Sequence, residues 1–213
     1  MNLLAQATIP TLPGPPLTPR LLLEEPLLLT GILIVLGVAG FVVFNAQGKV
    51  RLALMASAAG FLLAAGVQVL ALIVETPREK LLKATTGLVT ATAHADVVAL
   101  SPMLDPKVHL SNGFNVMYWP SGGEATDRDE LLARVREYIG RQYPLKECAI
   151  LETLAVVDGP GIGRSQVRVR AVMESWGVPI VSWWRIEWRE GKEGWMATDI
   201  QPLDLGIAGV RGR

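Results

Sequence analysis

Two long apolar segments near the N-terminus constrain this 213-residue chain more than any other feature. Leu27–Phe44 and Leu52–Val74 contain 18 and 23 residues, none of them Asp, Glu, Lys or Arg, and seven residues separate the two segments. At a helical rise of about 1.5 Å per residue, each can cross a hydrocarbon core of about 30 Å once Pro26 and Asn45 extend the first. The sequence therefore predicts a transmembrane helical hairpin over residues 26–75, in contact with a lipid bilayer.

Small residues in the second segment favour close packing of the two helices. Ala56, Gly60 and Ala64 are four residues apart and therefore share one helix face. This spacing is typical of helices that associate in lipid. Gln68 is the one strongly polar side chain within either segment, so we expect it to hydrogen bond to the first helix or to another copy of the chain. The absence of a charged residue in both segments argues against an ion path.

Basic residues in the connecting loop predict the membrane orientation. The loop contains Lys49 and Arg51 and no acidic residue, whereas the segment before the first helix has one arginine and two glutamates. The positive-inside tendency then places the loop in the cytoplasm. Basic residues after the second helix, Arg78, Lys80 and Lys83, favour the opposite orientation. We expect a two-span inner-membrane protein whose C-terminal domain lies outside the cytoplasm.

Composition divides the rest of the chain into two tails and one domain. Residues 1–25 contain five prolines and no basic cluster, which predicts a flexible tail and not a signal peptide. Residues 76–205 are long enough for one hydrophobic core, and residues 206–213 form a C-terminal tail. In residues 77–213 basic and acidic side chains balance at 17 each, which argues against a nucleic-acid surface.

The first half of this domain has helical periodicity. Apolar residues three and four apart predict a helix over Pro77–Ala93, and Asp96 is placed to cap a short helix over Val97–Leu100. Val108–Leu110 is typical of a short strand. Asp127 caps a further helix, which we expect Gly140 to end.

From Pro144 the apolar period changes from that of a helix to that of a strand. Four strands are predicted: Lys146–Val157, Ser165–Trp176, Ile180–Glu190 and Trp195–Gln201. Short glycine-containing turns join them, so neighbouring strands are antiparallel. Along the strands apolar residues alternate with Arg and Glu, which gives the sheet one apolar and one charged face. The sequence therefore predicts an α+β domain in which helices pack on one face of a curved antiparallel sheet.

One phrase of this domain carries a family resemblance. Leu88-Val89, His94-Ala95-Asp96-Val97, Leu100 and Leu104-Asp105-Pro106-x-Val108 follow one another at spacings that resemble the SnoaL-like branch of the NTF2-like superfamily. The resemblance covers about Arg78 to Leu205 and excludes the membrane hairpin. It implies a cone-shaped fold, a pocket between sheet and helices, and dimerisation through the sheet. It implies no single activity, because the superfamily includes enzymes and binding modules.

The resemblance also implies where an enzyme of this fold would keep its general base, namely on an Asp, His or Tyr inside the pocket. His109 lies on a strand near the expected pocket wall, and Asp199 alternates with Trp195 and Ala197 and could face inward. No His–Asp pair has a sequence spacing that supports either residue. The full set of candidates is His94, Asp96, His109, Tyr118, Glu152 and Asp199.

The chain has one cysteine and two histidines, which excludes a cysteine zinc site and leaves no metal or cofactor to expect. We interpret Cys148 as a small buried apolar residue on a strand.

Five tryptophans lie between residues 176 and 195, and two of them are adjacent. Trp183 and Trp184 must point to opposite faces of a strand. In one interpretation Trp184 and Trp188 pack under the helices while Trp183 covers Arg185 and Arg189. In the other, Trp183 marks a contact surface for a second copy of the chain or a membrane-protein partner. The candidate binding residues are thus Trp183, Trp184, Trp188 and Tyr118.

Three functional hypotheses follow from these observations. The first is a membrane-anchored NTF2-like domain that binds a partner or a small apolar ligand without catalysis. The alternative is a SnoaL-like isomerase, cyclase or dehydratase that acts by general acid–base chemistry on a small apolar substrate. A third is an anchor subunit of a larger membrane assembly.

Overall fold

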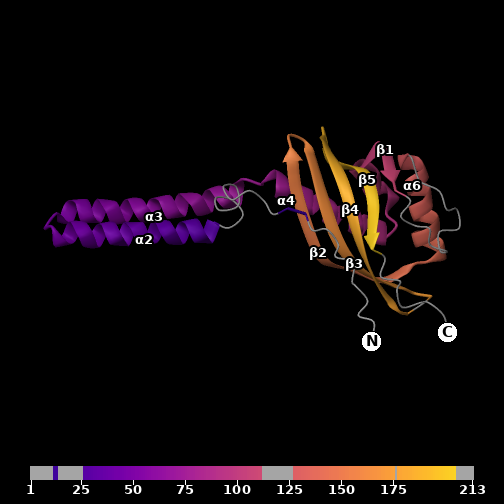
Figure 1. The fold of residues 1–213 in the computed structure, drawn as a ribbon, viewed down its shortest axis with the longest axis horizontal. Helices are drawn as coiled ribbons and strands as arrows, with labels where there is room; N and C mark the ends of the chain where they lie inside the picture. Colours follow the sequence, from indigo (N-terminus) through magenta and orange to yellow (C-terminus); the bar gives the residue numbers. More distant parts are fainter. Residues whose placement is uncertain (1–11, 14–25, 112–126, 176, 205–213) are drawn as a thin grey trace, which may run out of the picture. The chain divides into compact units, whose positions relative to one another are not determined.

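Helices α2 (Pro26–Ala46) and α3 (Val50–Ile73) belong to an N-terminal unit that spans Gly14–Thr76, and a second unit begins at Pro77 (Figure 1). The computed structural model describes residues 12–13, 26–111, 127–175 and 177–204. By length and composition, α2 and α3 could each cross a membrane, although a signal sequence or a core helix passes the same test.

The two N-terminal helices pack through their smallest residues. A Cβ atom on Gly60 would lie only 2.7 Å from the Cα of Gly37, so the backbones are in direct contact there. Gln68 Nε2 donates a hydrogen bond to Thr30 Oγ1 at 2.9 Å, which confirms the first of its two expected partners. Large apolar side chains point away from this contact, and Leu72 is 85% exposed. The buried residues of the pair are Gly37, Ala53, Gly60 and Ala64.

The second unit is built on one five-stranded sheet (Figure 1). The strands have the order β1-β5-β4-β3-β2; β1 runs parallel to β5, and the other neighbours are antiparallel. The four predicted strands are present with shifted ends, and the short strand predicted at Val108–Leu110 begins earlier and adds a fifth. The prediction of a wholly antiparallel sheet is wrong, because this fifth strand, β1, pairs in parallel with β5 and makes the sheet mixed. The bounds are β1 Leu104–Leu110, β2 Leu145–Gly159, β3 Ile162–Met173, β4 Pro179–Gly191 and β5 Gly194–Asp204.

The helices of this unit begin where their local signals predict. Helix α4 spans Pro77–Ala93 as expected, and Asp96 caps α5 (Val97–Leu100) by accepting a hydrogen bond from the Ala99 N–H at 3.0 Å. A short 3₁₀ turn, η2 (Ser101–Met103), leads into β1. Asp127 likewise caps α6 (Arg128–Arg134) through the Glu130 N–H. The bounds and caps that depend on nearby residues are therefore confirmed.

The predicted end of the last helix at Gly140 is wrong. Helix α6 continues without a break into a π-helix, η3, over Val135–Gln142. The Tyr143 N–H donates to the Tyr138 carbonyl, five residues back, at 2.7 Å. A Cβ atom on Gly140 would lie 3.2 Å from the Cβ of Ala95, on the turn after α4. The glycine allows this close approach of two segments and does not end the helix.

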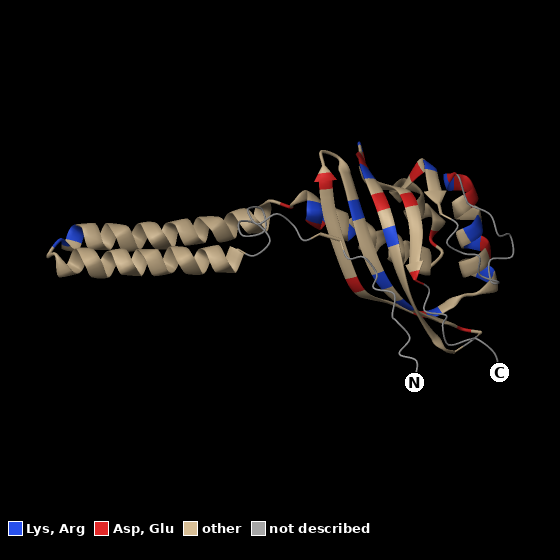
Figure 2. Cartoon of the chain, viewed as in Figure 1, with Lys and Arg blue, Asp and Glu red and all other residues tan. Residues whose placement is uncertain are grey.

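Tight turns and ion pairs shape the outer face of the sheet, which is the face turned away from α4. The β2–β3 turn is shorter than predicted, and Gly161 in it has a φ of +70°, a conformation that favours glycine. Arg164 donates two hydrogen bonds to Asp158 across this turn, each 2.7 Å long. Figure 2 shows charges of both signs along the visible face of the strands. The predicted alternation of a charged and an apolar face is present.

A buried polar chain joins α4 to the sheet within the apolar core. Trp188 Nε1 donates to Ser165 Oγ at 2.8 Å, and the hydroxyls of Ser165 and Thr85 are hydrogen bonded at 2.9 Å. The Thr85 hydroxyl also lies 2.8 Å from the Leu81 carbonyl oxygen. All four residues are at most 1% exposed. Each polar group therefore has a partner, as burial requires.

Candidate functional site

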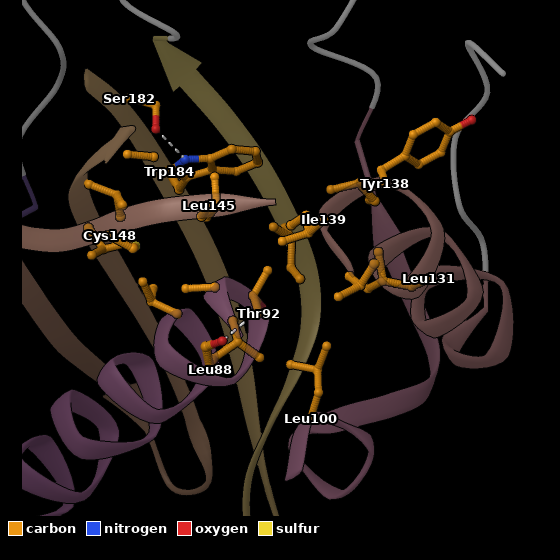
Figure 3. A pocket seen from close by; sticks show the side chains of 18 of the residues that line it. Leu88, Thr92, Leu100, Leu131, Tyr138, Ile139, Leu145, Cys148, Ser182 and Trp184 are labelled. Atoms are coloured by element: carbon orange, nitrogen blue, oxygen red, sulfur yellow. Dashed lines mark hydrogen bonds between the residues drawn. The ribbon is translucent and has the colours of Figure 1, made fainter. Parts of the chain in front are cut away.

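A cavity of about 310 Å³ lies between the inner face of the sheet and the helices of the second unit (Figure 3). Leu88 and Thr92 reach it from α4, Leu131 and Ile139 from α6 and η3, and Trp184 from β4. Aliphatic side chains make up most of its wall. The further lining residues are Val89, Ala93, Leu100, Leu104, Leu110, Val135, Tyr138, Tyr143, Leu145, Cys148, Val167, Val169, Ala171, Met173, Ile180, Ser182, Ile186 and Ile200.

Strand alternation and the π-helix together form this wall. Val167, Val169 and Ala171 are two residues apart on β3, so all three point to the inner face. A π-helix is wider than an α-helix, and its backbone hydrogen bonds span five residues. In this widened segment Val135, Ile139 and the following Tyr143 all reach the cavity.

The cavity wall holds few polar groups, and none is a charged side chain among the residues described. Trp184 Nε1 donates to Ser182 Oγ at 2.8 Å, and both side chains belong to β4 (Figure 3). The Thr92 hydroxyl donates to the Leu88 carbonyl oxygen at 2.8 Å. A charged ligand group buried against this wall would lack a counter-charge, which is costly.

Cys148 also contributes to this wall. The sequence predicts a fully buried side chain, but Cys148 is only half-buried on β2, because it faces the cavity. Burial raises the pKa of the thiol above its ordinary value. The thiol is therefore mainly protonated near neutral pH and is a slow nucleophile there.

His109 and Asp199, the two acid–base candidates, are brought together by the parallel pairing of β1 and β5. His109 Nδ1 lies 2.9 Å from Asp199 Oδ1, and the Ser111 hydroxyl lies 3.1 Å from the same carboxylate oxygen. Ser111 Oγ is also 3.3 Å from His109 Nδ1. A nucleophilic serine needs the other ring nitrogen, Nε2, while the carboxylate holds Nδ1. The trio is therefore not arranged as a catalytic triad.

This His–Asp pair faces away from the cavity. On the neighbouring residues of β1 and β5, Leu110 and Ile200 line the cavity, and adjacent residues of a strand point to opposite faces. The pairing of β4 with β5 shifts between Glu187–Asp199 and Trp188–Ala197, which leaves one extra residue in β5. Such a bulge reverses the alternation beyond it. The sequence predicts that Asp199 could face inward together with Trp195 and Ala197. The bulge turns Asp199 to the outer face instead.

The remaining acid–base candidates have other places in the fold. His94 Nδ1 lies 2.8 Å from the Thr90 carbonyl oxygen at the end of α4, and Asp96 is occupied as a helix cap. Glu152 is exposed on β2, opposite Arg168 in the register of the sheet. Tyr118 lies outside the described residues. None of the described candidates lines the cavity.

The tryptophans divide between the two faces of the sheet. Trp184 lines the cavity, and Trp188 is 1% exposed in the core beside it. Trp183 lies on the outer face, where the Arg168 guanidinium carbon is 5.7 Å from the centre of the indole ring. Arg168, directly opposite on β3, is thus the cation over this ring; the sequence had suggested Arg185 and Arg189.

A buried carboxylate connects β1 to β4. Asp105 is 4% exposed, accepts a hydrogen bond from the Lys107 N–H at 2.9 Å, and pairs with Arg189. Burial alone would raise the pKa of Asp105, but the Lys107 N–H and the Arg189 guanidinium outweigh it and lower the pKa below its ordinary value. Asp105 is ionised at neutral pH and has a structural role.

Solved structures allow this architecture to be compared with known folds. An NTF2-like protein with a cystatin-like fold from Novosphingobium aromaticivorans is 19% identical, with a TM-score of 0.50, and the match covers 70% of this chain and 90% of that one. The C-terminal unit has an NTF2-like fold. An NTF2-like protein from Cytophaga hutchinsonii is 15% identical with a TM-score of 0.49, covering 61% of this chain and 99% of that one. No protein-family model and no curated protein sequence matches the chain.

Only part of the cavity wall of this NTF2-like unit is among the residues predicted from the sequence. Trp184 is on the inner face as predicted, whereas Ser182 and Cys148 are not among the predicted binding residues. Ser182 could have been found, because it is two residues from Trp184 on a predicted strand and must share its face. Cys148 was placed on a strand, but nothing local indicates that this strand borders a cavity.

Proposed function

We propose that the NTF2-like unit binds a small apolar molecule in its cavity without transforming it. The observation that supports this most is the wall itself: none of the described residues that line it is Asp, Glu, His, Lys or Arg. Its volume of about 310 Å³ lies within the range of small-molecule sites, which begins near 300 Å³. Apolar cavities of about 150 Å³ already suffice to bind benzene.

Binding without chemistry fits the position of the acid–base groups. General acid–base catalysis needs a titrating group within hydrogen-bond reach of the substrate. His109 and Asp199 lie on the outer face, and the Cys148 thiol has a raised pKa. The isomerase, cyclase or dehydratase alternative therefore lacks a described Asp, Glu or His in contact with the cavity; of the residue types expected as a general base, only Tyr138 and Tyr143 line it.

We propose further that α2 and α3 anchor this unit in a membrane. In the most apolar stretch of each helix, only 6% and 11% of the residues are buried within the structure, whereas a core helix would be mostly buried. Their mutual contact uses glycine, alanine and the Gln68–Thr30 hydrogen bond, as helices do in lipid. The basic loop Lys49–Arg51 supports a cytoplasmic loop, with the NTF2-like unit on the other side of an inner membrane.

Membrane attachment and an apolar cavity suit each other chemically. Apolar molecules partition into bilayers, so a binding domain anchored in a membrane lies close to a store of such molecules. The phrase around His94-Ala95-Asp96 supports placing the unit in the SnoaL-like branch, whose members include proteins acting on small apolar compounds.

Cys148, the only cysteine of the chain, provides a direct test of the cavity. Because its thiol lines the wall, a bound molecule should slow its reaction with N-ethylmaleimide, measured by mass spectrometry on the full chain in nanodiscs. We expect ethylnaphthalene to protect Cys148 in a saturable manner. Failure of ethylnaphthalene to slow the reaction would contradict the proposal.

A matched pair of substitutions controls this test. Ala171→Phe fills the cavity from β3, and Ala149→Phe adds the same ring on the outer face of β2, where Ala149 is paired with Arg170. Protection should disappear in Ala171→Phe and persist in Ala149→Phe. Equal protection in both variants would show that the probe acts elsewhere.

A further inference from the structure

Four described residues that line the cavity carry a hydroxyl group: Thr92, Tyr138, Tyr143 and Ser182. Thr92 donates its single proton to the Leu88 carbonyl oxygen. Tyr138 directs its hydroxyl away from the other labelled side chains (Figure 3), and both tyrosines take part in further interactions. Ser182 differs from these, because its oxygen accepts the Trp184 N–H at 2.8 Å and its own proton is not used in that bond. The described residues offer the Ser182 proton no acceptor.

The indole of Trp184 also restricts where that proton can point. Ser182 and Trp184 are two residues apart on β4 and lie side by side at one end of the cavity (Figure 3). Because the indole N–H occupies one lone pair of Ser182 Oγ, the hydroxyl proton must point away from the indole ring. Because Ser182 is only half-buried, a ligand oxygen that accepts this proton replaces solvent as its partner and gains the net free energy of one hydrogen bond.

Charge narrows the class of ligand further. A carboxylate, phosphate or ammonium group in the cavity would meet no opposite charge among the described wall residues. Burying an unpaired charge costs several kcal/mol even after relaxation, on the order of the whole affinity of a small ligand. The ligand must therefore be neutral in the part that enters.

We infer that the cavity takes a neutral, largely apolar molecule whose oxygen, a ketone, ester or ether, accepts the hydroxyl proton of Ser182. This inference rests on the proposed function and adds to it the ligand class and the residue that orients the ligand. Ser182 is then the polar anchor of the site, and the aliphatic wall supplies most of the affinity.

Two probes of nearly equal shape distinguish the contribution of the Ser182 hydrogen bond to affinity from that of the aliphatic wall. Acetylnaphthalene carries a ketone oxygen, and ethylnaphthalene, substituted at the same ring position, has the same carbon skeleton without it. Their dissociation constants are measured by protection of Cys148 from N-ethylmaleimide, on the full chain in nanodiscs. Partition of each probe into lipid cancels when one probe is compared between variants.

Ser182→Ala should raise the dissociation constant of acetylnaphthalene about fivefold, the loss expected for one net hydrogen bond. The dissociation constant of ethylnaphthalene should change by less than about twofold. Ethylnaphthalene also corrects for any change in the cavity caused by removing Ser182 Oγ, which accepts the Trp184 N–H. Thr92→Val removes a cavity hydroxyl whose proton is already committed to Leu88. It should not change the ratio between the two probes.

The possible failures are distinguishable. If both probes bind the wild-type chain and Ser182→Ala changes them equally, or changes neither, Ser182 is not the anchor while the binding function stands. Ser182 is likewise excluded as the anchor if Thr92→Val produces the larger ketone-specific loss. If neither probe protects Cys148 in the wild-type chain, the proposed function fails, and this inference fails with it.

Discussion

Replacing Ser165 by Ala tests the buried polar chain that joins α4 to the sheet. The substitution removes the acceptor of the indole N–H of Trp188, a residue that is only 1% exposed to solvent. An unpaired buried donor costs about 1–3 kcal/mol. Thr85 loses one contact but keeps the Leu81 carbonyl oxygen as its partner. We therefore expect Ser165→Ala to reduce the free energy of unfolding by about 2 kcal/mol.

Tryptophan fluorescence during urea unfolding of the full chain in mild detergent measures this loss. All six tryptophans lie beyond residue 76, so the signal reports the NTF2-like unit alone. With a urea dependence of about 2 kcal/mol per molar, the midpoint should fall by roughly 1 M. A fall of less than about 0.3 M would refute the argument that the indole N–H depends on Ser165.

A double substitution separates the unpaired donor from a simple loss of packing. Trp188→Phe removes the N–H itself, so in Ser165→Ala/Trp188→Phe no donor is left unpaired. The double variant should lose about 1 kcal/mol less stability than the sum of the two single variants. Strict additivity would show that the two side chains act independently and that the hydrogen bond contributes nothing.

Three further predictions follow from the structure. Gly60→Val should disrupt the α2–α3 contact, seen as altered mobility of the hairpin on SDS gels, whereas Gly66→Val, which meets nothing within 4 Å, should not. The pKa of Asp105 is lowered in the folded state, so its carboxylate stabilises the fold fully above the unfolded-state pKa near 4, and this stabilisation is lost as the pH falls through the folded-state pKa. Asp105→Asn should therefore lower the urea midpoint less at pH 3 than at pH 6. Trp183→Ala should weaken self-association in sedimentation experiments and change the urea midpoint little, while Trp184→Ala on the inner face should lower the midpoint without affecting association.

The helices and strands were predictable where their signals are local. Asp96 and Asp127 cap the helices that follow them, and each cap depends on a backbone N–H three residues further along. Away from the bulge in β5, the two faces of the sheet follow from alternation alone. Such features depend on neighbours within a few residues, which a single sequence displays.

The errors arose where distant contacts decide the structure. Glycine is typical of helix ends, but Gly140 instead allows the close approach of Ala95, which is more than forty residues earlier in the chain. The bulge in β5 is a property of its pairing with β4, and it turns Asp199 to the outer face. The meeting of His109 with Asp199 depends on the parallel pairing of β1 with β5.

The cavity itself is the feature that sequence reasoning could least define. Alternation identifies which side chains face inward, but a close-packed core and a cavity wall use the same residues. Whether Val167, Ala171 and Ile186 meet the helices or leave space depends on how far α4 and η3 stand from the sheet. The π-helical widening that shapes this space has no signal in the local pattern.

The most direct test of apolar ligand binding is to extract and identify what the protein carries. The full chain and the Ala171→Phe variant are purified from membranes under identical mild conditions, and their organic extracts are compared by mass spectrometry. We predict that the wild-type extract contains a neutral, oxygen-bearing apolar compound in near-stoichiometric amount and that the cavity-filled variant lacks it. Extracts of identical composition from both proteins would contradict the account.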